Sequence, residues 1–309
     1  MPPPPAEPLV SVVIPCYAQA HFLADAIESV MGQTYRHFEI IVVNDGSPDV
    51  EQMEQVLRGY GERVRYVKQA NAGLSGAHNA GLRLAQGEFV VCLDSDDRLL
   101  PNALRTGVTA WSEFPTTGLV FGYNRLINVH GEPLDRTRVR VSDGSYTAML
   151  EQNTIGCPIN VMLRRCTVME VGAFSTELTH SEDYELFLRL TRLFGAHCHG
   201  QLVAEYRMHD ANMSKNHQGM LAGVLKTLEM QEEWVRGDAA LERALHRGRS
   251  NAWEIFDCDP MIWHFAQDVK SGRWLKAAAA AARLTFKYPR KFSAVLRQRT
   301  KRALRSALG

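Results

Sequence analysis

The chain has 309 residues, of which 45% are hydrophobic and 22% charged, and its formal net charge is +1. These values are ordinary for a soluble globular protein and exclude collagen-like, wholly disordered and disulfide-scaffold classes. The sequence has no run of about 18 apolar residues, so it predicts no transmembrane helix. Residues 1–8 are proline-rich and lack a signal-peptide pattern, and we expect them to form a flexible lead-in to a cytoplasmic protein.

Short apolar runs alternate with helical patterns through the first half of the chain. The apolar runs predict strands at residues 9–14, 39–43, 64–67 and 89–93. Helical spacing of apolar residues predicts helices at 22–31, 50–59 and 76–85, and Pro101 suits the first turn of another. This alternation predicts an α/β fold with a mostly parallel, doubly wound sheet flanked by helices.

Strand patterns continue through the middle of the chain and then stop. We expect strands at residues 119–127, 159–163 and 202–208, and a helix at 183–193. After about residue 216 every pattern is helical. The sequence therefore predicts one domain over residues 9–215 and an all-helical C-terminal region over 216–309.

Three polar clusters follow predicted strands at their carboxyl ends: residues 15–17, 44–47 and 94–97. In open parallel sheets, ligands bind in the crevice outside these ends. Because parallel strands bring their carboxyl ends to one edge, we expect the three clusters to lie together. The sequence therefore predicts a binding crevice at this edge.

The third cluster is Asp94-Ser95-Asp96-Asp97, which holds three carboxylates in four residues. Such carboxylates repel one another unless a cation lies among them, and Mg²⁺ or Mn²⁺ bound by carboxylates is commonly shared with substrate phosphates. The alternative is an acidic turn that caps the helix near Pro101. The preceding apolar strand favours the metal site.

Four other residues each have two interpretations from the sequence alone. Asp45 lies in an Asp-Gly turn but can also accept hydrogen bonds from a base or sugar. Tyr17 is either a core aromatic or a stacking surface for a nucleobase. Asp183 is either an acid that stabilises the N-terminus of a helix or a catalytic base. His209 either has a structural role or contacts phosphates.

Two nucleotide-binding motifs are absent. No G-x-G-x-x-G follows the first predicted strand, and no G-x-x-x-x-G-K-[ST] occurs. The absence argues against a Rossmann dehydrogenase and a P-loop NTPase.

Five segments, in the same order and at the same spacing, resemble glycosyltransferase family two. They are residues 10–17, 33–47, 71–81, 87–97 and 180–189, and the resemblance extends over about residues 8–215. It implies a GT-A fold and inverting transfer from a nucleoside-diphosphate sugar, with a UDP-sugar as the expected donor. It also implies a divalent metal cofactor, Mn²⁺ or Mg²⁺.

The resemblance implies a role for individual residues. Asp183 matches the catalytic base, and Asp94, Asp96 and His209 match positions near the metal. The residues implied in nucleotide-sugar binding are Pro15, Tyr17, Asp45, Asn71, Gly76, Asn79, Asp94, Ser95 and Arg207. A single displacement with one base inverts the anomeric centre, so the reaction needs no protein nucleophile. The start of a helix also stabilises an ionised carboxylate at Asp183.

Other functions remain as alternatives. A sugar nucleotidyltransferase would carry a glycine-rich, lysine-containing loop after the first strand, where this chain has residues 15–19 with neither glycine nor lysine. A phosphatase of the D-x-D type would carry its nucleophile after the first strand. An inactive sugar-nucleotide-binding protein is disfavoured by the intact Asp94, Asp96 and Asp183.

The C-terminal segment is strongly basic. Residues 269–309 hold 12 of the 35 lysines and arginines and none of the 34 acids. Residues 290–308 can form a basic amphipathic helix that binds an anionic membrane surface or packs on the chain itself. No nucleic-acid reader motif accompanies the charge, so we expect no nucleic-acid partner.

The family's breadth indicates a glycan or lipid-linked glycan acceptor in bacterial cell-surface polysaccharide or lipopolysaccharide synthesis. With a lipid-linked acceptor, we expect a cytoplasmic protein that is peripheral at the inner face of the membrane.

Overall fold

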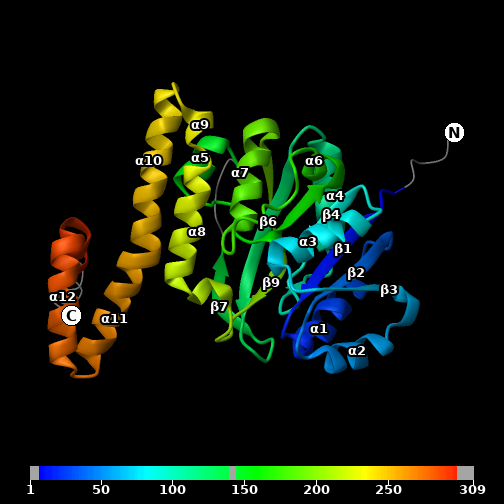
Figure 1. The fold of residues 1–309 in the computed structure, drawn as a ribbon, viewed down its shortest axis with the longest axis horizontal. Coiled ribbons are helices and arrows are strands. Elements are labelled where there is room, and N and C mark those ends of the chain that lie inside the picture. The colour runs from blue at the N-terminus through cyan, green and yellow to red at the C-terminus, as the bar shows by residue number, and fades with distance from the viewer. Residues whose placement is uncertain (1–6, 139–143, 298–309) are drawn as a thin grey trace, which may run out of the picture.

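The computed structural model describes residues 7–138 and 144–297. A nine-stranded sheet crosses the body of the protein, and helices cover both of its faces (Figure 1). The strand order is β3-β2-β1-β4-β8-β6-β9-β5, and β7 pairs with β6 beside this path. The last helices extend away from the body at the end opposite the N-terminus.

Four parallel strands form the N-terminal half of the sheet: β1 (Val10–Cys16), β2 (Phe38–Asp45), β3 (Val64–Gln69) and β4 (Phe89–Cys92). Every residue of β1 and β4 is buried, because helices cover both faces at these strands. The connecting helices are α1 (Ala20–Met31), α2 (Val50–Arg58) and α3 (Gly73–Leu84). The predicted alternation is therefore confirmed.

The second half of the sheet mixes parallel and antiparallel pairs. Its strands are β5 (Arg98–Leu99), β6 (Leu119–Ile127), β7 (Pro133–Arg138), β8 (Val161–Arg164) and β9 (Ala196–Arg207). Strand β8 runs antiparallel to β4 and β6, whereas β6 and β9 are parallel. The sequence did not predict β5 or β7, because β5 has two residues and β7 is polar.

Two apolar clusters lie on opposite faces of the sheet. One packs under α1, α2 and α4 (Ala103–Glu113). The other packs under α3, α5 (Tyr146–Glu151), α6 (Arg165–Glu170) and α7 (Glu182–Phe194). Helix α4 begins at Ala103, so Pro101 precedes the helix instead of lying in its first turn.

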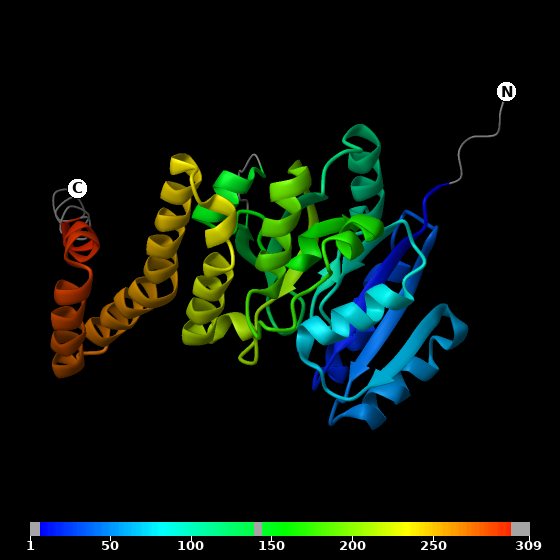
Figure 2. The same ribbon diagram turned by 45° about the horizontal axis from the view of Figure 1, so that its top comes forward.

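Only helices follow β9 within the described residues, as predicted. They are a 3₁₀ turn (Met213–Lys215), α8 (His217–Glu229), α9 (Glu232–Val235), α10 (Ala239–Trp253), a π-helical turn (Glu254–Cys258), α11 (Asp259–Lys270), α12 (Trp274–Lys287) and a last helix over residues 289–297. Helix α10 packs on α5 and α8, and α11 packs on α12. Figure 2 shows α12 at the far end of the molecule from β1, β2 and β3.

The predicted basic tail is only partly described. Residues 289–297 are helical, and residues 298–309 lie outside the described part of the chain. Phe292 is buried against Cys258 and Leu284, and Lys291 pairs with Glu254 at 2.8 Å and with Asp259 at 2.9 Å. The described part of the tail therefore packs on the chain's own helices. Among residues 7–138 and 144–297, no helix is long and apolar enough to cross a bilayer.

A buried histidine makes stability depend on pH. His78 of α3 is fully buried, stacks on Phe174 with ring centroids 4.6 Å apart, and has no hydrogen-bond partner among the described residues. Burial lowers the pKa of His78 to about 4. The unfolded chain takes up this proton below about pH 6.5 and the folded protein only near pH 4, so stability falls as the pH drops through that window. The expected loss approaches about 3 kcal/mol.

Urea unfolding between pH 7.5 and 4.5 measures this effect, with His78→Leu as the comparison. The variant should lose less stability than the parent over this range. Burial also lowers the pKa of His199 to about 4, so only the difference between the two proteins reports on His78. Equal slopes for both proteins would contradict the assignment.

Candidate active site

Hydrogen bonds join the three loops that follow β1, β2 and β4, as the sequence predicts, and we call the region that these loops border the crevice. The backbone N–H of Ala18, after β1, donates to Ser47 Oγ, after β2, at 2.7 Å. Gln19 Nε2 donates to Asp96 Oδ2, after β4, at 3.3 Å, and Ser95 Oγ donates to Gln19 Oε1 at 2.8 Å. Gln19 therefore ties the first loop to the acidic loop.

Asp45 organises one side of the crevice. Its Oδ1 accepts hydrogen bonds from Gln69 Nε2 at 2.7 Å and from the backbone N–H of Ala72 at 2.8 Å. The next residue, Gly46, has φ +70°, and a Cβ there would lie 2.8 Å from the backbone nitrogen of Asn71. Glycine is needed because the two loops approach this closely. Asp45, the last residue of β2, and Asn71, in the loop after β3, thus lie where the loops after these two strands are in direct contact.

The remaining residues of this side differ in exposure. Pro15 is buried within β1, whereas Tyr17 is exposed beyond its end and can offer a ring face to a ligand. Gly76 of α3 faces the methyl group of Ala72, where any side chain would collide with it. Tyr17 is therefore the accessible aromatic surface of this side.

Asn79 is engaged inside the protein. Its Nδ2 donates to the carbonyl of Phe174 at 2.8 Å, and its Oδ1 accepts from the Phe174 N–H at 3.0 Å. Both ends of the amide hold α3 to the segment before α7. In this structure Asn79 links two parts of the fold.

Asp96 is the most connected carboxylate of the acidic loop. Its Oδ2 lies 2.7 Å from His209 Nε2 and also accepts from Gln19. The backbone N–H of His209 donates to Asn212 Oδ1 at 2.6 Å, and the centroids of the His209 and Phe22 rings lie 5.3 Å apart. The structure thus brings together Asp96 and His209, which are 113 residues apart in sequence.

The crevice is strongly acidic. Burial, and then the carboxylates of Asp96, Glu182 and Asp183, raise the pKa of Asp94. Burial likewise raises the pKa of Glu182 and of Asp97, and the charges of Asp96 and Asp94 raise that of Asp97 further. These interactions place Asp183, at the start of α7, in the same electrostatic field as the acidic loop. Such a site favours a cation.

Asp183 lies in the first turn of α7. Its Oδ1 accepts a hydrogen bond from the Tyr184 N–H at 2.7 Å, and its side chain is half-buried. Ser181, which precedes the helix, has φ +64°, an uncommon conformation for a non-glycine residue. Glu182 is buried, and its Oε2 has no partner within the described residues. Two carboxylates with different surroundings therefore stand side by side at this helix start.

Arg207 acts inside the protein. Its side chain is 1% exposed, with Nε donating to the Asp96 carbonyl at 2.7 Å and a terminal nitrogen donating to Asp25 at 2.7 Å. Its other terminal nitrogen donates to the Val129 carbonyl, and its backbone N–H donates to Asp97 Oδ1 at 2.7 Å. All three guanidinium nitrogens are engaged, so in this structure Arg207 holds the acidic loop and does not present its charge to a diphosphate.

Replacing Arg207 by Met should therefore destabilise the fold. The change leaves buried acceptors without donors, and we expect the free energy of unfolding to fall by about 3 kcal/mol. Lys226→Met is the matched control, because Lys226 and Glu229 form an ion pair in which both side chains are exposed, and such a pair contributes about 1 kcal/mol or less. Urea denaturation measures both variants. Equal stability of Arg207→Met and the parent would contradict the structural role of Arg207.

Comparison of the sequence with models of known protein families shows which family the chain belongs to. The sequence model described as Glycosyl transferase family 2 matches residues 11–171, just over half of the chain. The chain belongs to glycosyl transferase family 2.

Two relatives illustrate the relationship. An uncharacterized glycosyltransferase of Rickettsia felis is 30% identical over 215 residues, which cover 67% of this chain and 35% of that protein. The chain thus spans about a third of that relative's length. A protein of Escherichia coli, UDP-Glc:alpha-D-GlcNAc-diphosphoundecaprenol beta-1,3-glucosyltransferase WfgD, is 28% identical over 235 residues, which cover 74% of this chain and 86% of that protein.

Solved structures share the fold. A mannosyltransferase from Pyrobaculum calidifontis, in complex with GDP-Man and Mn²⁺, aligns over 98% of this chain and 83% of its own, with a TM-score of 0.63 and 19% identity. TarS 1-349 of S. aureus, in complex with UDP-GlcNAc, aligns over 92% of this chain and 83% of its own, with a TM-score of 0.63 and 17% identity. The predicted GT-A fold is confirmed.

The metal that family 2 implies can be tested against the residues present. Among residues 7–138 and 144–297, no three His, Cys, Asp or Glu side chains form a ready ligand group. Asp94 and Asp96 nevertheless offer hard carboxylate oxygens in a field that favours a cation, and His209 lies beside Asp96. Mg²⁺ and Mn²⁺ commonly take only one or two protein carboxylates and complete their shell with phosphates and water. The residues fit a cation shared with a family 2 donor.

Sequence reasoning missed three residues of this site. Gln19 bridges Ser95 and Asp96, Asn212 holds the backbone of His209, and Asp25 pairs with Arg207. The only available signal was position, since Gln19 follows a strand end and Asn212 follows the Tyr-Arg-Met-His segment.

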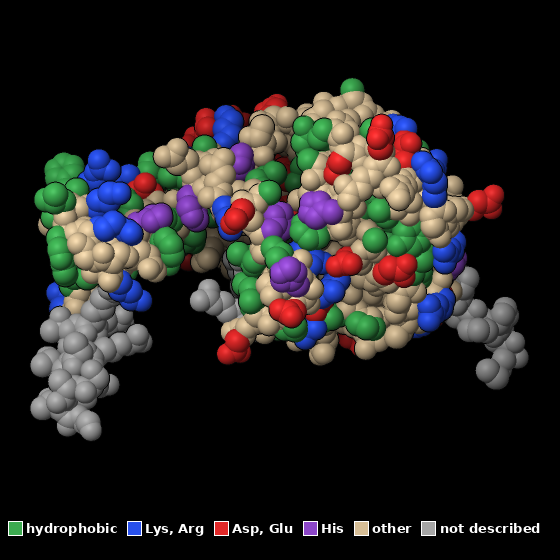
Figure 3. Space-filling model, turned by 90° about the horizontal axis from the view of Figure 1, so that it is seen from below, with side chains coloured by type: hydrophobic (Ala, Val, Ile, Leu, Met, Phe, Trp, Pro, Cys, Tyr) green, Lys and Arg blue, Asp and Glu red, His purple; other side chains and the backbone are tan. Residues whose placement is uncertain are grey.

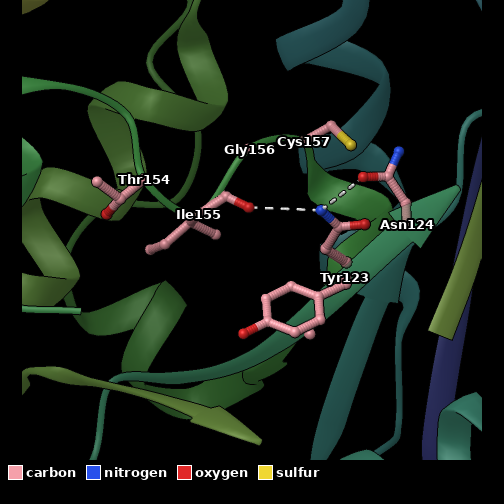
Figure 4. A pocket seen from close by; sticks show the side chains of 8 residues that line it. Tyr123, Asn124, Thr154, Ile155, Gly156 and Cys157 are labelled. Atoms are coloured by element: carbon pink, nitrogen blue, oxygen red, sulfur yellow. Dashed lines mark hydrogen bonds between the residues drawn. The ribbon is translucent and has the colours of Figure 1, made fainter. Parts of the chain in front are cut away.

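A small pocket lies beside β6. Residues 154–157 form one wall, and Tyr123 and Asn124 form the other (Figure 4). Asn160 Nδ2 donates to Asn124 Oδ1 at 3.5 Å and to the Ile155 carbonyl at 3.4 Å. Within the described chain, Asn124 Nδ2 and Asn160 Oδ1 have no partner. An ordered water typically satisfies buried atoms of this kind.

Proposed function

We propose that this family 2 chain transfers a sugar from a UDP-sugar to a hydroxyl group of a glycan or lipid-linked glycan. The observation that carries the proposal is that hydrogen bonds link the loops after β1, β2 and β4, and that Asp183 at the start of α7 acts electrostatically on Asp94 in the acidic loop. A nucleotide sugar has a base, a diphosphate and a sugar. The crevice offers separate chemistry for each of them.

The donor side follows from the strand-end loops. Tyr17 offers an exposed ring for base stacking, and Asp45 is an acceptor already oriented by Gln69 and Ala72. Asn71 and Gly76 lie beside it on the loop and first turn of α3. The UDP assignment is supported by the E. coli relative, whose name includes UDP-Glc, and by the TarS complex with UDP-GlcNAc.

The chemistry needs a base and a means to stabilise the departing diphosphate. We assign the base to Asp183, which takes the proton of the acceptor hydroxyl as its oxygen attacks the anomeric carbon from the face opposite the diphosphate. The attack forms the new glycosidic bond, breaks the bond to the diphosphate and inverts the centre. Asp94 and Asp96 would hold Mn²⁺ or Mg²⁺, which when bound offsets negative charge on the leaving group. The mannosyltransferase complex with Mn²⁺ supports the cation.

Arg207 and Asn79 have positioning roles in this proposal. Arg207 holds the acidic loop through Asp97 and the Asp96 carbonyl, and Asn79 fixes α3 to the segment that leads to α7. His209 orients Asp96 and is close enough to join it at a cation. These roles replace direct donor contacts of Arg207 and Asn79.

The acceptor is the least constrained part of the proposal. The E. coli relative is named for a diphosphoundecaprenol-linked sugar acceptor. We infer a bacterial cell-surface polysaccharide or lipopolysaccharide pathway and work at the inner face of the membrane. A sugar nucleotidyltransferase does not agree with the family, and an inactive sugar-nucleotide-binding protein is one outcome of the test.

The test uses the full chain with a panel of UDP-, GDP- and dTDP-sugars. Binding is measured by calorimetry with and without Mn²⁺, and release of the nucleoside diphosphate is measured with a lipid-diphosphate-linked sugar as acceptor. We expect metal-dependent binding and release with a UDP-sugar. Binding without release for every acceptor would favour an inactive binding protein, and no binding of any donor would contradict the proposal.

A further inference from the structure

Helix α12 presents an apolar face that nothing in the described chain covers. Leu275 is 90% exposed and Phe286 is 92% exposed, and Trp274 at the start of the helix is 67% exposed. Leu275, Ala279, Ala282 and Phe286 recur at helical spacing, so they share one face. The opposite face, with Ala277 and Leu284, is buried against α11 and the following helix.

This apolar face has basic neighbours. Residues 269–297 contain eight lysines and arginines and no acid. Lys276 and Arg283 lie on α12 beside the apolar face, and neither forms an ion pair with any described residue. Figure 3 shows hydrophobic side chains along the outer edge of the C-terminal helices, next to a group of Lys and Arg. The surface therefore combines exposed apolar groups with unpaired positive charge.

Three of the six other lysines and arginines of residues 269–297 form ion pairs with acids earlier in the chain. Lys287 pairs with Asp257 at 2.8 Å, Arg273 with Asp268 at 2.7 Å, and Lys291 with Glu254 and Asp259. These pairs hold α12 and the next helix to α11 and the π-helical turn. The acids of that region are used internally, so they do not neutralise Lys276 and Arg283.

Three other occupants fit this surface less well. A second copy of the chain, joined face to face, would bring two basic α12 surfaces together. The rest of the tail, residues 298–309, is itself basic and has no acid to offer. A nucleic acid would match the charge but would leave Leu275 and Phe286 without an apolar partner.

We propose that the outer face of α12 docks on an anionic lipid bilayer. Amphipathic helices that lie in the interface bury Trp, Phe and Leu at the acyl boundary and keep Lys and Arg at the headgroups. On α12, Leu275 and Phe286 enter the bilayer, Trp274 lies at the interface, and Lys276 and Arg283 meet the lipid phosphates. The proposal moves the predicted membrane contact from residues 290–308 to α12, because Phe292 and Lys291 face inward.

Vesicle sedimentation with the full chain tests the proposal. The parent should bind vesicles of mixed phosphatidylglycerol and phosphatidylcholine at low salt, bind less at high salt, and bind weakly to phosphatidylcholine alone. Tryptophan emission should shift to shorter wavelength on binding, and Trp274→Phe should remove most of that shift. No binding to the anionic vesicles at low salt would overturn the proposal.

Paired variants separate the apolar from the ionic contribution. Leu275→Ser with Phe286→Ser should weaken binding at least about ten-fold. Lys276→Gln with Arg283→Gln should weaken it about 25-fold, since each charge near an anionic leaflet contributes about five-fold. The controls lie on the sheet-bearing body: Leu193→Ser, which is also exposed, and Arg58→Gln with Arg83→Gln. Equal losses in the control variants would also overturn the proposal.

Two further measurements distinguish lipid binding from self-association and from catalysis. Analytical ultracentrifugation of the parent and of Leu275→Ser/Phe286→Ser reports on self-association, and a dimer lost in the variant without a change in vesicle binding would assign the face to a second copy. Donor hydrolysis in solution, without vesicles, should be unchanged in every α12 variant. Vesicle binding by a chain that hydrolyses no donor would leave this proposal standing while the proposed function fails.

Discussion

The Asp96→Asn variant is expected to lose at least about 100-fold in metal-dependent donor turnover while it keeps its fold. Asn removes one carboxylate from the pair that we assign to the cation. It keeps the size of the side chain and an oxygen that can still face His209 and Gln19. The loss should therefore reflect charge and not a collapsed loop. Steady-state kinetics against metal concentration, with circular dichroism as the fold check, measures it.

Asp210→Asn is the matched control for this variant. Asp210 follows His209 directly, but its side chain is exposed and pairs with Lys215 on the surface. Its replacement removes a negative charge from the same region without touching the crevice. We expect turnover within about two-fold of the parent, since an exposed pair contributes little. Full activity of Asp96→Asn at limiting metal would contradict the assignment of the acidic loop to the cation.

The Asp183→Asn variant is expected to lose roughly 10²–10⁴-fold in transfer rate and to keep its affinity for the donor. A base acts on the proton of the acceptor hydroxyl, so its loss affects the chemical step at saturating substrate. The Tyr184 N–H, which donates to Asp183, can donate instead to the amide oxygen of Asn, and this preserves the helix start. Transfer rate and donor affinity, measured separately, distinguish a base from a binding residue.

Glu182→Gln is the informative comparison, because Glu182 is the neighbouring carboxylate and burial raises its pKa. If Asp183 is the base, Glu182→Gln should reduce the rate far less than Asp183→Asn. The reverse order would move the base to Glu182. A fall in donor affinity of Asp183→Asn with an unchanged rate would identify Asp183 as a binding residue.

Strands β1 and β4 in the N-terminal half of the sheet were predictable because they are buried on both faces. Strands β1 and β4 read as continuous apolar runs, and their parallel pairing then fixes which loops meet. Strand β7 escaped prediction because its six residues include one aspartate and two arginines and pair at the edge of the sheet. Strand β9 begins six residues before the prediction, since residues 196–201 contain two histidines and a glycine instead of an apolar run.

The site was predictable to the extent that it depends on strand ends. The contacts of Arg207 were not predictable, because a sequence does not reveal that a guanidinium is enclosed by backbone carbonyls from two other loops. The same holds for Asn79, whose amide is occupied by a backbone segment 95 residues away. Ordinary residue types in long-range contacts carry no local pattern.

The contacts between the acidic loop and the end of β9 determine when the site can form during synthesis. Asp97 and Asp96 cannot form these contacts until Arg207 and His209 have been synthesised, 110 and 113 residues later. At about 5–20 residues per second, the ribosome needs roughly 5–20 s to add that length. During this interval the acidic loop lacks the contacts that hold it in the folded protein. Catalytic competence is therefore one of the last properties that the body of the protein acquires.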